Sequence, residues 1–77
     1  MNAVTPFDTR ETLAQSVARL YRADAIYFQQ RAANNAALAV YALDTGALDR
    51  ACDCQRAAAY FAAQAWRSLS RLIEAEQ

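Results

Sequence analysis

A single glycine near the middle of the chain separates two long helix-forming stretches. Gly46 is the only glycine among the 77 residues, and it follows Asp44 and Thr45. Glycine has no Cβ atom, so it can take the left-handed backbone conformation in which many helices end. Asp44 or Thr45 can then offer a side-chain oxygen to the unpaired N–H groups of the next helix. We therefore predict that the chain folds back on itself at residues 44–46.

The stretches on either side of this turn predict two helices within one domain, residues 1–77. Alanine, the strongest helix former, occupies twenty positions, and the chain has one proline. We expect helix 1 over about residues 6–43 and helix 2 over about residues 47–74. Thr5 and Asp8 begin two equally good helix-start patterns, and the sequence does not choose between them. The alternative is one continuous helix through Gly46. A single glycine destabilises a helix by only about 1 kcal/mol, which a long helix can tolerate.

Each stretch carries two adjacent apolar stripes at helical spacing. The principal stripe of the first contains Leu13, Val17, Leu20, Tyr27, Leu38 and Tyr41, and the alanine-rich stripe beside it contains Ala14, Ala18, Tyr21, Ala25, Phe28, Ala32, Ala39 and Ala42. The principal stripe of the second contains Leu48, Cys52, Gln55, Ala59, Ala62, Trp66, Leu69 and Ile73, with Ala51, Ala58, Ala65 and Leu72 beside it. One contact between two helices buries one stripe on each, so the hairpin needs a further neighbour.

The second pair of stripes predicts that two hairpins associate. The expected fold class is all-α: a two-helix antiparallel hairpin that homodimerises into a four-helix bundle with coiled-coil-like packing. Residues expected in the core of the hairpin or of the dimer are Leu20, Phe28, Asn35, Leu38, Leu48, Gln55, Phe61, Ala62, Trp66 and Leu69. In architecture the hairpin is similar to plasmid-encoded Rop-like hairpins, which is a likeness of fold alone.

A turn at residue 46 also predicts which residues lie opposite one another. If both helices are regular, residue i of the first lies level with roughly residue 90 − i of the second. The dipeptides Tyr27-Phe28 and Tyr60-Phe61 then form one aromatic layer. Asn34 and Asn35 face Gln55 in the same register, and buried amides tend to fix the pairing of helices.

The residue types argue against catalysis and against a bound cofactor. The chain has no histidine, no nucleophile beside a base and no glycine-rich phosphate loop. Cys52 and Cys54 are two residues apart on a helix, so their side chains point about 200° apart and cannot clasp one metal ion. We interpret them as structural thiols, the alternative being an intersubunit disulfide or metal site. The prediction is therefore no enzyme, with no catalytic residue, no cofactor and no metal.

Six outward residues are candidates for binding a partner. Four arginines converge on the end of the hairpin opposite the turn, and two apolar side chains lie among charged residues on outward faces. These six residues are Arg19, Arg22, Ile26, Tyr60, Arg67 and Arg71. Exposed aromatic side chains within an arginine-rich surface are typical interface anchors. The alternative interpretation is a solvated surface whose arginines pair with the acids near the C-terminus.

Charge and hydropathy narrow the class of partner. Eight arginines balance eight acidic residues, so the chain has no overall attraction to nucleic acid or to anionic lipid. The longest apolar run falls well short of the roughly 20 residues that cross a bilayer. The N-terminus lacks the pattern of a signal peptide, so we expect a cytoplasmic protein without membrane contact. The bias toward alanine and arginine indicates a bacterial, phage or plasmid origin.

These observations predict a small non-enzymatic regulator or adaptor. It homodimerises and binds another protein, in the manner of a phage- or plasmid-type inhibitor of a host protein. Two alternatives stay open: a nucleic-acid-binding bundle that uses the arginine cluster, and a small chaperone-like subunit of a hetero-complex.

Overall fold

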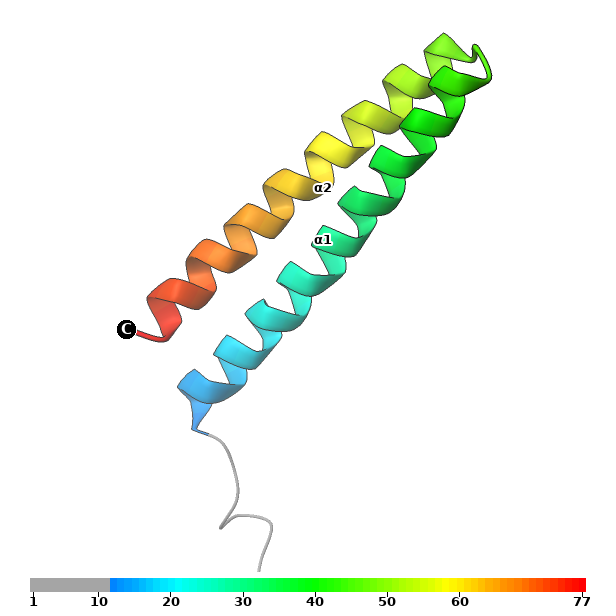
Figure 1. The fold of residues 1–77 in the computed structure, drawn as a ribbon. Helices are drawn as coiled ribbons and strands as arrows, with labels where there is room; N and C mark the ends of the chain where they lie inside the picture. Colours follow the sequence, from blue (N-terminus) through cyan, green and yellow to red (C-terminus); the bar gives the residue numbers. More distant parts are fainter. Residues whose placement is uncertain (1–11) are drawn as a thin grey trace, which may run out of the picture.

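The computed structural model describes residues 12–77, which fold as two long antiparallel helices (Figure 1). Helix α1 spans Leu13–Asp44 and helix α2 spans Leu48–Ala75. Figure 1 shows the two helices side by side, with the C-terminus near the start of α1. The described residues contain no strand. The predicted all-α hairpin is therefore confirmed, and one continuous helix is excluded.

Helix α1 begins at a capping box that the sequence analysis overlooked. The backbone N–H of Gln15 donates to Thr12 Oγ1 at 3.1 Å, and the backbone N–H of Thr12 donates to Gln15 Oε1 at 2.8 Å. These two bonds satisfy two N–H groups that the first turn of a helix leaves unpaired. Both predicted helix starts, at Thr5 and at Asp8, lie outside the described residues.

The turn closes with a Schellman motif centred on Gly46. Its φ of 79° lies in the left-handed region, as predicted. The N–H of Gly46 donates to the carbonyl of Leu43 at 3.1 Å, and the N–H of Ala47 donates to that of Ala42 at 2.8 Å. These bonds satisfy carbonyls that the last turn of α1 leaves free, which is how a left-handed glycine ends a helix.

The predicted side-chain cap for the second helix is wrong. Ala47 is the N-cap residue of α2, and no side chain bonds to the N–H groups there. Asp44 is still part of α1. The hydroxyl of Thr45 donates backward to the carbonyls of Tyr41 and Ala42, at 3.1 and 3.2 Å. Thr45 therefore helps to end α1 and does not start α2.

The two helices meet along their alanine-rich stripes. The buried residues of the described chain are Ala18, Ala25, Ala39, Ala42, Ala51, Ala58, Ala65, Ser68 and Leu72. Alanines on this line recur every seven residues, which keeps one face of each helix turned toward the other. Small side chains let two backbones approach closely along their whole length. Each buried methyl contributes only about 0.8 kcal/mol, so the hairpin alone has a weak core.

The principal stripes lie outside this contact between the two helices. Most of their large side chains are exposed: Leu13, Leu20, Tyr27, Leu38, Tyr41, Leu48, Trp66, Leu69 and Ile73. The physical reason is steric. Bulky side chains would hold the helices apart along their whole length, whereas the alanines permit continuous contact.

The predicted aromatic layer is confirmed. The rings of Phe28 and Phe61 stack across the helix contact with centroids 6.2 Å apart. Tyr27 and Tyr60 each pack edge-on against the neighbouring phenylalanine of their own helix. Arg31 adds its guanidinium over the Phe61 ring at 5.2 Å. This layer fixes the register of the two helices at the predicted level.

Candidate interaction surface

The helix contact divides the rest of the hairpin surface into two broad faces. Arg22 and Asp24 illustrate the division, because side chains two residues apart leave a helix in nearly opposite directions. Arg22 lines a groove between the helices with Ile26 and Leu69. Asp24 lines a different groove, together with Arg71. Residues three and four positions away from those that line each groove continue the two faces along the length of the hairpin.

The first face, here called the Trp66 face, is uncharged over most of its length. It consists of Ile26, Gln29, Ala33, Ala36, Val40 and Leu43 of α1, and of Leu48, Cys52, Gln55, Ala59, Ala62, Trp66, Leu69 and Ile73 of α2. All fourteen residues are exposed, and none carries a charge. Trp66, the only tryptophan, is 68% exposed. Twelve of the fourteen are apolar, and the other two are Gln29 and Gln55, so this strip is an exposed and mainly apolar surface.

The opposite face, here called the Tyr60 face, mixes tyrosines with charges. It consists of Leu13, Val17, Leu20, Asp24, Tyr27, Arg31, Asn34, Leu38 and Tyr41 of α1, and of Arg50, Asp53, Ala57, Tyr60, Gln64, Arg67, Arg71 and Glu74 of α2. Its α1 half is mainly apolar, and its α2 half is mainly polar. Four arginines and three acids are distributed along it, so this face combines aromatic contact area with charge.

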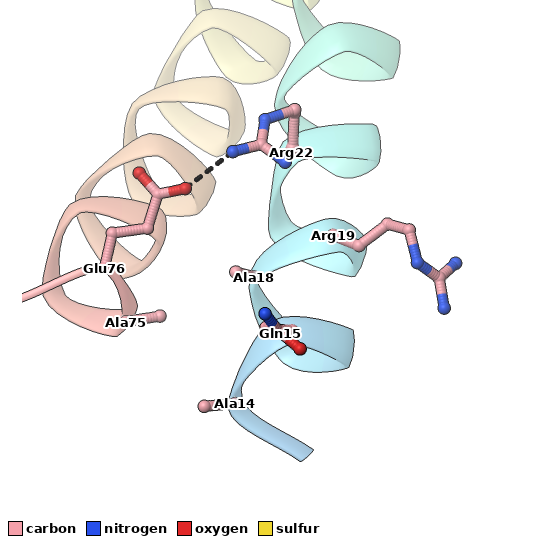
Figure 2. Close-up of a pocket in the computed structure, with 7 residues that line it drawn as sticks. All are labelled: Ala14, Gln15, Ala18, Arg19, Arg22, Ala75 and Glu76. Carbon is pink, nitrogen blue, oxygen red and sulfur yellow. Dashed lines mark hydrogen bonds and ion pairs between the residues drawn. The ribbon is translucent and has the colours of Figure 1, made fainter. Parts of the chain in front are cut away.

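The end of the hairpin opposite the turn carries an ion pair between α1 and the residue that follows α2 (Figure 2). Arg22 Nη2 of α1 lies 2.6 Å from Glu76 Oε2 just beyond α2, and both side chains are about half exposed. Figure 2 shows Arg19 pointing away from this pair, on the outer side of α1. Ala14, Ala18 and Ala75 form the apolar part of the groove around them. The pair ties the two free ends of the helices together, but as an exposed bridge it contributes at most about 1 kcal/mol.

The structure separates the six predicted partner-binding residues into two groups. Arg19, Arg22 and Ile26 lie on the side of the Trp66 face, and Tyr60, Arg67 and Arg71 lie on the Tyr60 face. The four arginines therefore do not form one cluster. This division between two faces was not predicted from the sequence. The seven-residue repeat of alanines, at positions 18, 25, 32 and 39 and again at 51, 58 and 65, is the signal that reveals it.

The predicted core residues also fall into two groups. Phe28, Asn35 and Phe61 are partly buried at the helix contact. The exposed ones are Leu20 and Leu38 on the Tyr60 face, and Leu48, Gln55, Ala62, Trp66 and Leu69 on the Trp66 face. Asn35 Nδ2 donates to the carbonyl of Arg31 in its own helix at 2.8 Å, and Gln55 is exposed on the Trp66 face. A role of the exposed residues in a dimer core stays a prediction.

The described residues hold two free thiols. Cys52 is exposed on the Trp66 face, and Cys54 is half-buried at the helix contact. No three Cys, Asp or Glu side chains between residues 12 and 77 lie close enough together to hold a metal ion. Neither helix of the described chain has a segment apolar enough to cross a membrane.

Comparisons of this chain with protein-family models, with curated proteins and with solved structures found no match.

Proposed function

We propose that this chain is a small, cytoplasmic, non-enzymatic regulator or adaptor that homodimerises and acts by binding another protein. The observation that carries the proposal is the Trp66 face, fourteen exposed and uncharged positions in an unbroken strip. Exposing the apolar part of this strip to water is unfavourable by about 25 cal/mol for each Å² of apolar surface. Covering the strip with protein recovers that free energy.

The size of the Trp66 face suits a specific interface. Helix α2 has 28 residues, which is a length of about 40 Å at about 1.5 Å per residue. Two adjacent helices are about 20 Å wide, since their axes lie about 8–10 Å apart. A covered face therefore removes on the order of 800 Å² per protomer from water, which is the standard size for a stable complex. A second copy presents the same surface and is always available.

The Tyr60 face is the proposed site for the other protein. Tyr60 is 59% exposed, and Arg67 and Arg71 lie on the same stretch of helix. Tyrosine and arginine are the residue types that most often dominate binding energy at protein interfaces. Their position away from the Trp66 face leaves them accessible in a dimer.

The chaperone-like alternative uses the same apolar surface with a different occupant. In that case the Trp66 face packs on another polypeptide, and the isolated chain is monomeric or poorly soluble. The nucleic-acid alternative has less support, because its four arginines are divided between two faces and Arg22 is neutralised by Glu76. A salt-sensitive micromolar affinity for DNA or RNA would restore it.

The test is a pull-down with the purified dimer as bait. Capture of a partner protein is compared for the wild-type chain, a double variant of the Tyr60 face and a control variant. The wild-type chain is expected to retain one protein from a bacterial lysate. Tyr60→Ala together with Arg67→Glu is expected to abolish capture while the dimer persists. Ala63→Glu, an exposed change on the outer edge of α2 that belongs to neither face, is the matched control and keeps capture. No captured protein, or equal loss with the control, counts against the adaptor function.

A further inference from the structure

We propose that the Tyr60 face binds the Tyr60 face of another copy, with the two turns at opposite ends of the pair. A twofold axis then crosses the face at right angles to the helices, so α1 runs antiparallel along α1 of the other copy, and α2 along its α2. This contact is a second self-association surface and does not depend on the Trp66 face. It covers the site proposed for the other protein, so the two binding events exclude each other; only this last consequence rests on the proposed function.

The axis lies at the level of the aromatic layer. It passes Tyr27 on α1 and the point midway between Tyr60 and Gln64 on α2. Phe28 and Phe61 are next to these two points and stack across the helix contact with centroids 6.2 Å apart, so the two points lie at one level. Residues equally far from the axis along the same helix, on its two sides, therefore meet across the contact.

The charges of α2 are complementary about this axis. Arg50 and Glu74 are each twelve residues from it, on opposite sides, and therefore meet between copies. Asp53 and Arg71 are each nine residues from it and meet in the same way. Within residues 12–77, Arg50, Arg71 and Glu74 form no ion pair. Asp53 Oδ1 lies 3.5 Å from Arg56 of its own helix, and its second oxygen is left for the arginine of the other copy.

The α1 row of the face has the same symmetry. Asp24 lies three residues before Tyr27 and Arg31 lies four residues after it, so each acid meets an arginine of the other copy. The guanidinium of Arg31 lies over the Phe61 ring at 5.2 Å, which holds it near the centre of the face. Beyond these charges, apolar residues at one end of the row meet apolar residues at the other. They are Leu13, Val17, Leu38 and Tyr41.

Other arrangements of the same two faces separate these charges from their partners. With both turns at one end, α1 of one copy lies against α2 of the other at equal level. Arg71 then lies against Leu20, and Asp24 with Arg67 is the one ion pair that remains. A charge held against apolar side chains is unfavourable. If the turns stay at opposite ends but one copy slides by seven residues, Asp24 meets Asp24 or Arg31 meets Arg31. Like charges repel, so complementary charge selects one orientation and one register.

This contact should be weaker than the one proposed for the Trp66 face. Its α2 half is charged, and ion pairs that stay in contact with water fix orientation more than they add affinity. Its α1 half supplies the apolar area, where Leu20 is 59% and Tyr27 54% exposed. We therefore expect this association at protein concentrations on the order of 1 mM, whereas the contact through the Trp66 face is expected at micromolar concentrations.

The experiment measures self-association of the full chain after Trp66→Glu has blocked the Trp66 face. Sedimentation equilibrium at about 1 mM is expected to give a mass that rises from 8.5 kDa toward twice that value and no further, because one face remains. Circular dichroism checks that the variant stays helical, and Trp66→Gln replaces it if it does not. A helical chain that stays at 8.5 kDa at this concentration overturns the proposal.

Exchange of two charges tests the orientation in the same blocked chain. Asp53→Arg places two arginines together at each of the two contacts and should weaken dimerisation about 5- to 10-fold. Adding Arg71→Asp restores opposite charges and should recover most of the affinity. Asp49→Arg, the same change of charge on the exposed outer edge of α2, is the matched control and should leave dimerisation unchanged. Dimerisation that is insensitive to Asp53→Arg, or a double variant as weak as the single one, overturns the proposed pairing. Either result leaves the pull-down prediction, and with it the proposed function, intact.

Discussion

Phe28 of α1 stacks on Phe61 of α2 with ring centroids 6.2 Å apart and ring planes inclined by 22°. The buried residues next to this stack are the alanines Ala25, Ala58 and Ala65, so the two rings are the bulky contact that holds the register at this level. Phe61→Ala removes a half-buried ring, and we expect the free energy of unfolding to fall by about 2 kcal/mol. Urea titration at a fixed protein concentration measures it. Tyr41→Ala, on an exposed ring of α1, is the control and should stay within about 0.5 kcal/mol.

The alanine line predicts intolerance of larger side chains at one set of positions. Ala65 is 1% exposed against α1, whereas Ala63 faces solvent on the same helix. Ala65→Leu must push the helices apart, and overpacking of this kind costs about 1–3 kcal/mol. Ala63→Leu adds the same atoms without a steric conflict. Thermal unfolding of the two variants should differ clearly, and equal melting temperatures would show that the helices do not meet at Ala65.

Gly46 occupies a left-handed conformation with no atom within 4 Å of the place where a Cβ would stand. Gly46→Ala therefore meets no clash, and its cost is the conformational one of about 1–2 kcal/mol. Gly46→Asn should cost less, because asparagine tolerates left-handed backbone better than other side chains do. Chemical unfolding at one protein concentration ranks the three chains. An alanine variant as stable as the wild type would contradict the turn geometry.

The hairpin and its turn could be predicted from the sequence because they depend on residues that are close together in the chain. One glycine between two alanine-rich stretches specifies the reversal, and regular helix geometry then places Phe28 at the level of Phe61. Hydrophobicity alone could not predict which of the two adjacent stripes packs at the helix contact. Leucine and tryptophan are more hydrophobic than alanine, so a hydrophobicity scale favours the stripe that the structure leaves exposed. Close approach of two long helices favours the smallest side chains, and the seven-residue repeat of Ala18, Ala25 and Ala32 carries that information.

The start of α1 was missed for a related reason. Three threonines precede it, and each is a good N-cap by type. Thr12 is the one whose third following residue, Gln15, bonds back to the backbone of the cap. The two faces were missed as well, because their separation depends on which stripe is buried. Once the alanines face inward, the position of every other side chain follows.

The homodimer is proposed to form through the Trp66 face. Sedimentation equilibrium of the wild-type chain and of Trp66→Glu, both at micromolar concentrations, is the sharpest test of this interface. Tyr27→Glu, which introduces the same charge on the Tyr60 face, is the matched control. We expect about 17 kDa for the wild type and for Tyr27→Glu, twice the 8.5 kDa of one chain, and 8.5 kDa for Trp66→Glu. A wild-type chain that sediments as a folded monomer, or a Trp66→Glu variant that remains dimeric, would contradict it.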